Sequence, residues 1–239
     1  MSRELRGIIF VEGVSDQNIL KNLMNKYFNI KFDKEPIKEN EKRFLYKYNQ
    51  ELILLETDGV KNMPPAVERQ IQNFNKNGNV VKKIFIIIDA DKSKQSGEQF
   101  VCSITDKCKD TGVQFAHHII TRPGKDYGIM EDLFLDIVVN LTDKSADDFY
   151  QKNTIMQLVS DVRNDVDKDT EKKHYSNKIK AATTSFVRFY NCYEDIDKND
   201  IITLAEQDDG IVKKLMEYDT IKQMLEKIKQ HFNLEQASN

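Results

Sequence analysis

Five consecutive apolar residues run directly into a pair of aspartates. Residues 84–88 read Ile-Phe-Ile-Ile-Ile, and Asp89, Ala90 and Asp91 follow at once. A short apolar run that is rich in β-branched side chains and bounded by polar residues indicates a strand buried on both faces of a parallel sheet. Helices must cover both faces of such a sheet, so we expect an α/β protein.

Strand and helix patterns alternate through the first half of the chain. Apolar runs at residues 7–11 and 52–55 indicate two more buried strands, and a fourth strand is expected at about residues 113–120. Each of the first three strands is followed by a segment with helical periodicity. Residues 29–50 are rich in lysine and glutamate and indicate at most one edge strand. The pattern predicts a parallel sheet covered by helices.

Helical periodicity replaces the strand pattern in the second half of the chain. Apolar residues recur at helical spacing in residues 130–139, 146–163 and 176–190, and two more helices are expected before the end. The expected organisation is therefore an α/β domain at residues 1–140 and a helical extension at residues 141–239 that packs on it.

Composition excludes several classes of protein. The 36 Lys and Arg residues and 39 Asp and Glu residues give a net charge of −3, so any nucleic acid must be met by local lysines such as Lys172, Lys173, Lys178 and Lys180. The three cysteines form no C-x-x-C pair, which argues against disulfides and zinc. No apolar stretch is long enough to cross a membrane, so we expect a cytoplasmic protein without a membrane partner.

Carboxylates follow two of the expected strands. Glu12 comes after the first strand, and Asp89 and Asp91 come after the third. Ligands of parallel sheets bind beyond the carboxyl ends of the strands. Side chains two residues apart on an extended segment point to the same side, so Asp89 and Asp91 can converge on one hard cation such as Mg²⁺. An acidic residue after a strand is also common as a helix cap or turn former, which is the alternative for each residue alone.

The two acidic segments resemble the motifs of Toprim domains. Val11-Glu12-Gly13-Val14-Ser15-Asp16 is similar to the first Toprim motif, and Ile86-Ile87-Ile88-Asp89-Ala90-Asp91 is similar to the second, in the same order. Asp16 lies four residues after Glu12, and an acidic residue at this position is a feature in which the chain resembles the overcoming-lysogenization-defect (OLD) nucleases. Residues 128–135 resemble a segment of stand-alone Toprim-like proteins. The resemblance covers residues 7–135.

The resemblance implies roles for individual residues. Glu12 would act as general acid or base or as a metal ligand, and Asp89 and Asp91 would hold Mg²⁺ or Mn²⁺. A second ion would draw on Asp16 and on Glu131 or Asp132, although acids at a helix start also stabilise the helix dipole. A lysine after the core, Lys178 or Lys180, would neutralise charge that develops on phosphate, although an ordinary solvated helix face is the alternative.

The expected function is metal-dependent hydrolysis of phosphodiester bonds in DNA or RNA, with a partner protein such as a separate ATPase. One alternative is a non-catalytic Toprim-fold adaptor or effector. Another is a phosphatase that resembles the haloacid dehalogenases, because residues 89–93 resemble their nucleophile loop, but Glu12 would then have no role.

Two histidines are adjacent on the fourth expected strand. His117 and His118 should point to opposite faces of the sheet, because side chains alternate along a strand. They are therefore not expected to bind one metal ion together.

Overall fold

A six-stranded mixed sheet forms the centre of the fold. The computed structural model describes residues 5–37, 40–49, 51–76, 80–91, 93–141, 157, 160–161, 164, 179–183 and 209–237. The strand order is β2-β3-β4-β1-β5-β6. The strands are β1 (Leu5–Val11), β2 (Asp33–Ile37), β3 (Asn40–Tyr48), β4 (Leu52–Glu56), β5 (Val81–Asp89) and β6 (Gln114–Ile120).

Most of the sheet is parallel. β1 pairs in parallel with β4 and β5, and β5 pairs in parallel with β6. β2 and β3 form an antiparallel hairpin at one edge. The α/β class with a mostly parallel sheet covered by helices is confirmed, whereas the expectation of at most one strand in residues 29–50 is wrong. This hairpin lies at the sheet edge, where a strand needs fewer apolar residues, so its lysines and glutamates hid the strand pattern.

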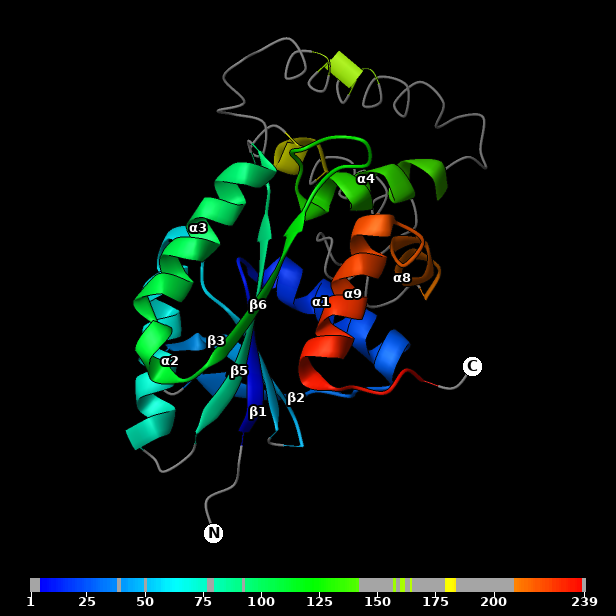
Figure 1. Cartoon of the computed structure of the whole chain (residues 1–239). Coiled ribbons are helices and arrows are strands. Elements are labelled where there is room, and N and C mark those ends of the chain that lie inside the picture. Colours follow the sequence, from blue (N-terminus) through cyan, green and yellow to red (C-terminus); the bar gives the residue numbers. More distant parts are fainter. Residues whose placement is uncertain are drawn as a thin grey trace.

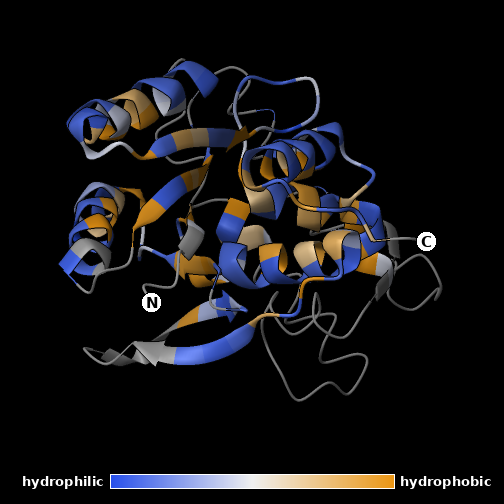
Figure 2. Ribbon diagram, turned by 60° about the horizontal axis from the view of Figure 1, so that its bottom comes forward, coloured by the Kyte–Doolittle hydropathy of each residue, from blue (hydrophilic) through white to orange (hydrophobic). Residues whose placement is uncertain are grey.

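Helices cover both faces of the sheet and its carboxyl edge. α2 and α3 lie on one face, α1, α8 and α9 lie on the other, and α4 crosses near the carboxyl ends of the strands (Figure 1). The hydrophobic sides of the helices face the sheet (Figure 2). The helices are α1 (Val14–Phe28), α2 (Met63–Lys76), α3 (Lys94–Lys107), α4 (Met130–Leu141), α8 (Asp209–Leu215) and α9 (Asp219–Phe232), with 3₁₀ turns η1 (Val60–Asn62) and η2 (Lys109–Thr111).

Alternating side chains of the central strands belong to two hydrophobic clusters, one on each face of the sheet. On β1, Ile8 and Phe10 pack with α2 and α3, whereas Ile9 and Val11 pack with α1 and α9. Each of these four side chains is at most 1% exposed. Burial on both faces explains why the central strands are continuous apolar runs, and it leaves only the strand ends for polar chemistry.

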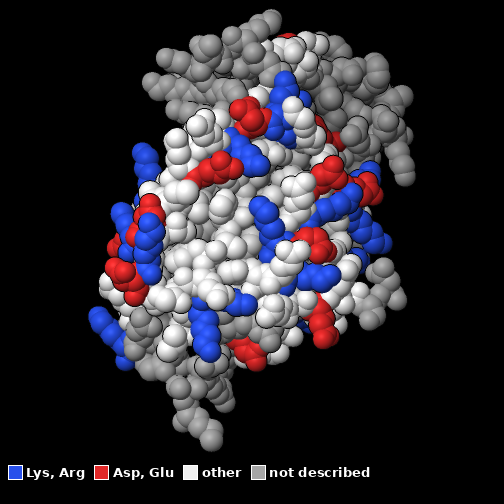
Figure 3. All heavy atoms as spheres, viewed as in Figure 1, with Lys and Arg blue, Asp and Glu red and all other residues white. Residues whose placement is uncertain are grey.

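Charged side chains of both signs are intermixed on the face shown in Figure 3. This distribution agrees with the net charge of −3. No helix among the described residues is long and apolar enough to cross a membrane.

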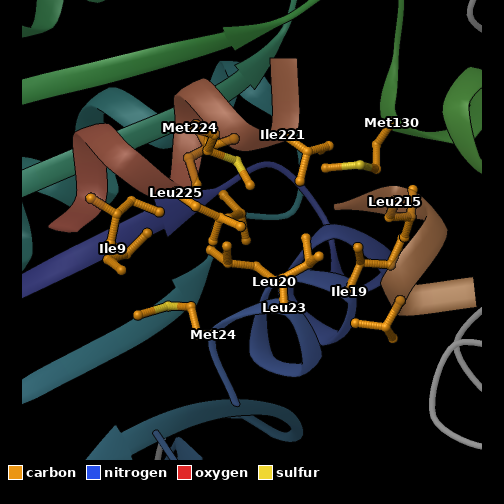
Figure 4. Packing of buried hydrophobic residues seen from close by; sticks show 14 of the residues in the cluster. Ile9, Ile19, Leu20, Leu23, Met24, Met130, Leu215, Ile221, Met224 and Leu225 are labelled. Carbon is orange, nitrogen blue, oxygen red and sulfur yellow. The ribbon is translucent and has the colours of Figure 1, made fainter. Parts of the chain in front are cut away.

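The C-terminal helix α9 shares the core of the sheet. Leu20 and Leu23 of α1 face Leu225 of α9, and Met130 of α4 lies beside Ile221 (Figure 4). The described part of the predicted extension thus contributes to the same hydrophobic cluster as the sheet. The helices predicted at residues 146–163 and 176–190 lie largely outside the described residues.

Replacing Leu225 by alanine should destabilise the whole domain. The side chain is 1% exposed, so its truncation should lower the free energy of unfolding by about 2–5 kcal/mol. The exposed Gln230 lies on the same helix, and Gln230→Ala should change this free energy by less than about 0.5 kcal/mol. Urea denaturation measures both variants. Equal midpoints for Leu225→Ala and wild type would show that α9 is not part of the cooperative core.

Candidate metal centre

Acidic residues gather at the carboxyl edge of the sheet. β1 ends at Val11 and β5 ends at Asp89, and because these neighbouring strands are parallel, their ends lie at the same edge. α1 begins just after β1, and α4 begins close to this edge (Figure 1). Three different segments of the chain can therefore direct side chains into one site.

Asp16, Asp89 and Glu131 form the acidic cluster of this site. One carboxylate oxygen from each lies within 4.8 Å of the other two. Asp89 is 8% exposed and Glu131 is 7% exposed, and Asp16 is half-buried. Oε2 of Glu131 is buried and has no hydrogen-bond partner among the described residues. Buried carboxylates repel one another at this separation, so the arrangement has the oxygen donors and the charge to hold a divalent cation.

Backbone hydrogen bonds position Asp89. Its Oδ1 accepts a hydrogen bond of 3.0 Å from the N–H of Met130, which opens α4. Its own N–H donates to Oε1 of Glu12 over 2.8 Å. The end of β5 is thereby joined to the segment after β1 and to the start of α4. Glu12 lies beside the acidic cluster rather than within the set of three.

Asp16 of the cluster and the further acid Asp132 cap the helices that enter the site. Oδ2 of Asp16 accepts from the N–H of Gly13 over 3.0 Å, as the third residue of a capping box does at the start of α1. Oδ2 of Asp132 accepts from the N–H of Ile129 over 3.3 Å at the start of α4. Of the two residues that the resemblance left open, it is Glu131 that lies in the cluster, while Asp132 caps the helix.

The backbone turns sharply at Asp91. Its φ is +43°, in the left-handed region, and its N–H donates to the carbonyl of Gly128. The expectation that Asp89 and Asp91 lie on one extended segment is wrong, because β5 ends at Asp89 and the chain turns toward Ser93, the N-cap of α3. Asp91 is not one of the three clustered acids, and its part in metal binding stays a prediction.

A lysine from the C-terminal half of the chain reaches the cluster. Nζ of Lys180 lies 3.8 Å from Oε1 of Glu131, and its side chain is 47% exposed. Burial would lower the pKa of Lys180, but Glu131, Asp89, Asp16 and Glu12 together raise it above its usual value. Lys180 therefore stays protonated beside the carboxylates. Lys172, Lys173 and Lys178 lie outside the described residues.

Burial and mutual repulsion raise the pKa values of the carboxyl groups. Burial is the largest cause for each of them. It raises the pKa of Glu12 to about 7, with a further contribution from Asp91, and that of Glu131 to about 7, with a contribution from Asp16. The pKa of Asp16 rises to about 6, and that of Asp89 lies well above its ordinary value. A bound cation would favour the charged form of every one of these groups.

A small cavity of about 10 Å³ adjoins the acidic cluster. Glu12, Asp16 and Asp89 line it together with apolar side chains that include Leu20 and Met130. This volume is close to that of one water-sized sphere. The site thus offers room for an ion or a single water above an apolar floor.

The histidines of β6 lie outside the acidic cluster. Nε2 of His118 is 3.0 Å from Oγ1 of Thr220, and His117 is half-buried on the same strand. Neither histidine belongs to the group of three residues whose side chains could hold an ion together.

Comparisons with known proteins add a family. A model described as "Protein of unknown function (DUF3226)" matches residues 6–176. The chain is also similar to a solved structure described as hypothetical protein PH0156 from Pyrococcus horikoshii OT3, with 15% sequence identity and a TM-score of 0.47 over 97% of this chain and 96% of that chain. No curated protein matches.

Stability without metal should fall as the pH rises through the range in which the cluster ionises. The pKa of Glu131 rises from 4.5 to about 7 in the folded state. The folded protein then binds more protons than the unfolded chain, so this stabilising contribution is complete below pH 4.5 and is lost as the pH passes 7. As the pH rises between these limits, the free energy of unfolding of Glu131→Gln should increase relative to that of wild type by up to about 3 kcal/mol.

Urea denaturation in EDTA at several pH values measures this difference. His118 has a pKa lowered to about 3 by burial and then by Lys227, and it destabilises the fold at low pH. This effect is common to wild type and variant and cancels in the comparison. Glu235→Gln changes an exposed side chain, so its free energy of unfolding should depend on pH in the same way as that of wild type. Parallel curves for Glu131→Gln would contradict the proposed repulsion.

Proposed function

The chain belongs to the DUF3226 family, and from the chemistry of its site we propose that it is a Toprim-type, metal-dependent phosphodiesterase that cuts nucleic acid. Its substrate is DNA or RNA, and its ion is Mg²⁺ or Mn²⁺. The resemblance of the Glu12 and Asp89 segments to the two Toprim motifs supports the substrate class.

The single observation that carries the proposal is the convergence of Asp16, Asp89 and Glu131. These residues are far apart in the chain, yet an oxygen of each lies within 4.8 Å of the others. A set of carboxylate oxygens suits Mg²⁺ and Mn²⁺, which are usually held by few carboxylates and complete their coordination with water and phosphate oxygens. The buried, unpaired Oε2 of Glu131 fits an ion at this place.

Glu12 is suited to move a proton. Its pKa of about 7, raised by burial, allows it to accept or donate a proton near neutral pH. The N–H of Asp89 fixes its Oε1, so the second oxygen is the one available to a water or a leaving group. A divalent ion held by the neighbouring carboxylates would supply positive charge that makes water more acidic and stabilises phosphate oxygens.

Lys180 is suited to bind a phosphate group of the substrate. It stays protonated beside Glu131, and nearly half of its side chain is exposed. A cation in this position can pair with a phosphate oxygen of the substrate and stabilise the charge that develops during cleavage. Asp91 adds negative charge near Glu12. We retain it as a ligand for an ion that lies closer to the turn after β5.

The phosphatase alternative fits these contacts less well. It requires Asp89 as a nucleophile, but Oδ1 of Asp89 accepts a hydrogen bond from the N–H of Met130, and it leaves no role for Glu12, which accepts from the N–H of Asp89. The non-catalytic adaptor differs from the proposed enzyme by binding the ion without cleaving nucleic acid. Cooperation with a separate ATPase remains compatible with both.

The purified protein should nick plasmid DNA or cut RNA only when Mg²⁺ or Mn²⁺ is present. Asp89→Asn removes a clustered charge and should lower the cleavage rate on the order of a hundredfold or more. Asp110→Asn makes the same chemical change at an exposed position in η2 and should keep the wild-type rate. Gel assays of plasmid and RNA measure both rates.

Thermal melting with and without the ion separates the outcomes. An ion at one hundred times its dissociation constant stabilises the folded state by about 2.7 kcal/mol. The melting temperature of wild type should rise accordingly when the ion is added, and Asp89→Asn should lose most of this rise. Stabilisation of wild type without any cleavage would support the adaptor. Cleavage that persists in EDTA, or equal cleavage by Asp89→Asn, would overturn the proposed enzyme.

A further inference from the structure

A second, much larger hollow lies beside the open edge of the sheet. Its volume is about 720 Å³, which is the size of a small-ligand site. β6 forms its floor, and α3 and α9 flank β6 on either side (Figure 1). We call it the β6 cavity. It shares no lining residue with the small cavity at the acidic cluster.

Two buried nitrogen atoms lie without partners at the floor of the β6 cavity. His118 is 4% exposed, and its Nδ1 has no hydrogen-bond partner among the described residues, while its Nε2 contacts Thr220. Nη1 of Arg122 is also buried without a partner in the described part of the chain. Buried polar atoms of native proteins are normally satisfied, so these atoms point to a ligand with acceptor oxygens.

Cationic side chains from three elements meet at the β6 cavity. Lys94 opens α3, Arg122 follows β6, and Lys227 lies on α9. Nζ of Lys227 is 3.4 Å from the carbonyl oxygen of His117, a long hydrogen bond. Within the described residues, none of these three cations forms an ion pair. Burial and the nearby charge of Lys94 lower the pKa of Lys227, and Glu98 offsets only part of this effect.

Carboxylates also line the β6 cavity, and like Lys94 and Lys227 they are exposed. The four acidic residues of the lining are all exposed: Glu98, Asp126, Glu217 and Asp219. The charges that act on His118 are positive. Burial is the main cause that lowers the pKa of His118 to about 3, and Lys227 and Lys94 lower it further. The surroundings of His118 thus favour an anion.

Two helices begin at the β6 cavity. Lys94 is the first residue of α3, and Asp219 is the first residue of α9. The positive ends of both helix dipoles therefore add to the field of the lysines. Arg122 offers a planar pair of donors, and the hydroxyl group of Thr121 offers one more. This combination of donors suits the tetrahedral oxygens of a phosphate group.

The β6 cavity is one strand away from the acidic cluster. Ile120 at the end of β6 pairs with Asp89 at the end of β5, and neighbouring strands are about 4.8 Å apart. The loop that begins with Arg122 returns to the metal centre, where the carbonyl of Gly128 accepts from the N–H of Asp91. One nucleic-acid chain can therefore reach both places.

We propose that the β6 cavity binds a phosphate group of the substrate chain that lies outside the bond to be cut. The proposal rests on the proposed function and assigns Lys94, Arg122 and Lys227 as its phosphate ligands. The metal centre then acts on one phosphodiester while the β6 cavity holds another phosphate group of the same strand and fixes its register. Both phosphate groups belong to one strand of nucleic acid, so a single-stranded segment is sufficient to occupy both places.

Binding of short single-stranded DNA and RNA in EDTA tests this proposal without the metal centre. Lys94→Gln and Lys227→Gln each remove one exposed charge and should weaken binding on the order of fivefold at low salt. Each should also reduce the slope of log affinity against log salt by about 0.7 to 1. Lys109→Gln makes the same change in η2, outside the β6 cavity, and should match wild type. Fluorescence anisotropy measures binding, and melting confirms that each variant is folded.

Each result either supports or overturns the phosphate assignment. Equal binding by all three variants and wild type, or no binding by wild type, would overturn it and leave the metal-dependent activity to be judged by the Asp89 test. Inorganic phosphate and nucleoside monophosphates serve as competitors. If they bind with the same dependence on Lys94 and Lys227 but the oligonucleotides do not, the β6 cavity takes a free phosphate compound and the substrate-strand proposal is overturned.

Discussion

Repulsion between Asp16, Asp89 and Glu131 is the interaction that the rest of the structure has to overcome. Separate elements hold the three carboxylates in a largely buried site, where burial raises the pKa of each. Lys180 offsets part of the charge, but its nitrogen is 3.8 Å from Glu131 and reaches the cluster from the outer side. Such an arrangement costs stability without a cation and gains it when an ion binds.

The sheet supplies the rigidity that this repulsion requires. β1 and β5 are buried on both faces, so their ends cannot move apart without opening the core. Hydrogen bonds then join the ends to the helices: Asp89 connects Glu12 of one segment to Met130 of another, and Asp16 caps the start of α1. The neighbouring strand β6 leads into the loop that carries Arg122, so the candidate metal centre and the β6 cavity lie at the same sheet edge.

Local patterns predicted the parts of the fold that depend on local burial. Residues 84–88 had to form a central strand because only burial on both faces suits such a run, and this placed Asp89 at the sheet edge. Asp91 could not be placed in this way, because the turn at the end of β5 depends on contact with Gly128. The approach of Glu131 to Asp16 and the meeting of Lys94 with Lys227 depend on packing between distant segments, so no short pattern in the sequence could reveal them.

The central claim is that the three clustered carboxylates bind a divalent ion, and a crystal grown with Mn²⁺ tests it most directly. An anomalous difference map locates manganese without reference to activity or to a substrate. We predict one strong peak bounded by oxygen atoms of Asp16, Asp89 and Glu131 at about 2.1 Å, with the peak missing from Asp89→Asn crystals under the same conditions. A map with no peak there, or with manganese bound only at exposed acids elsewhere, would contradict the claim.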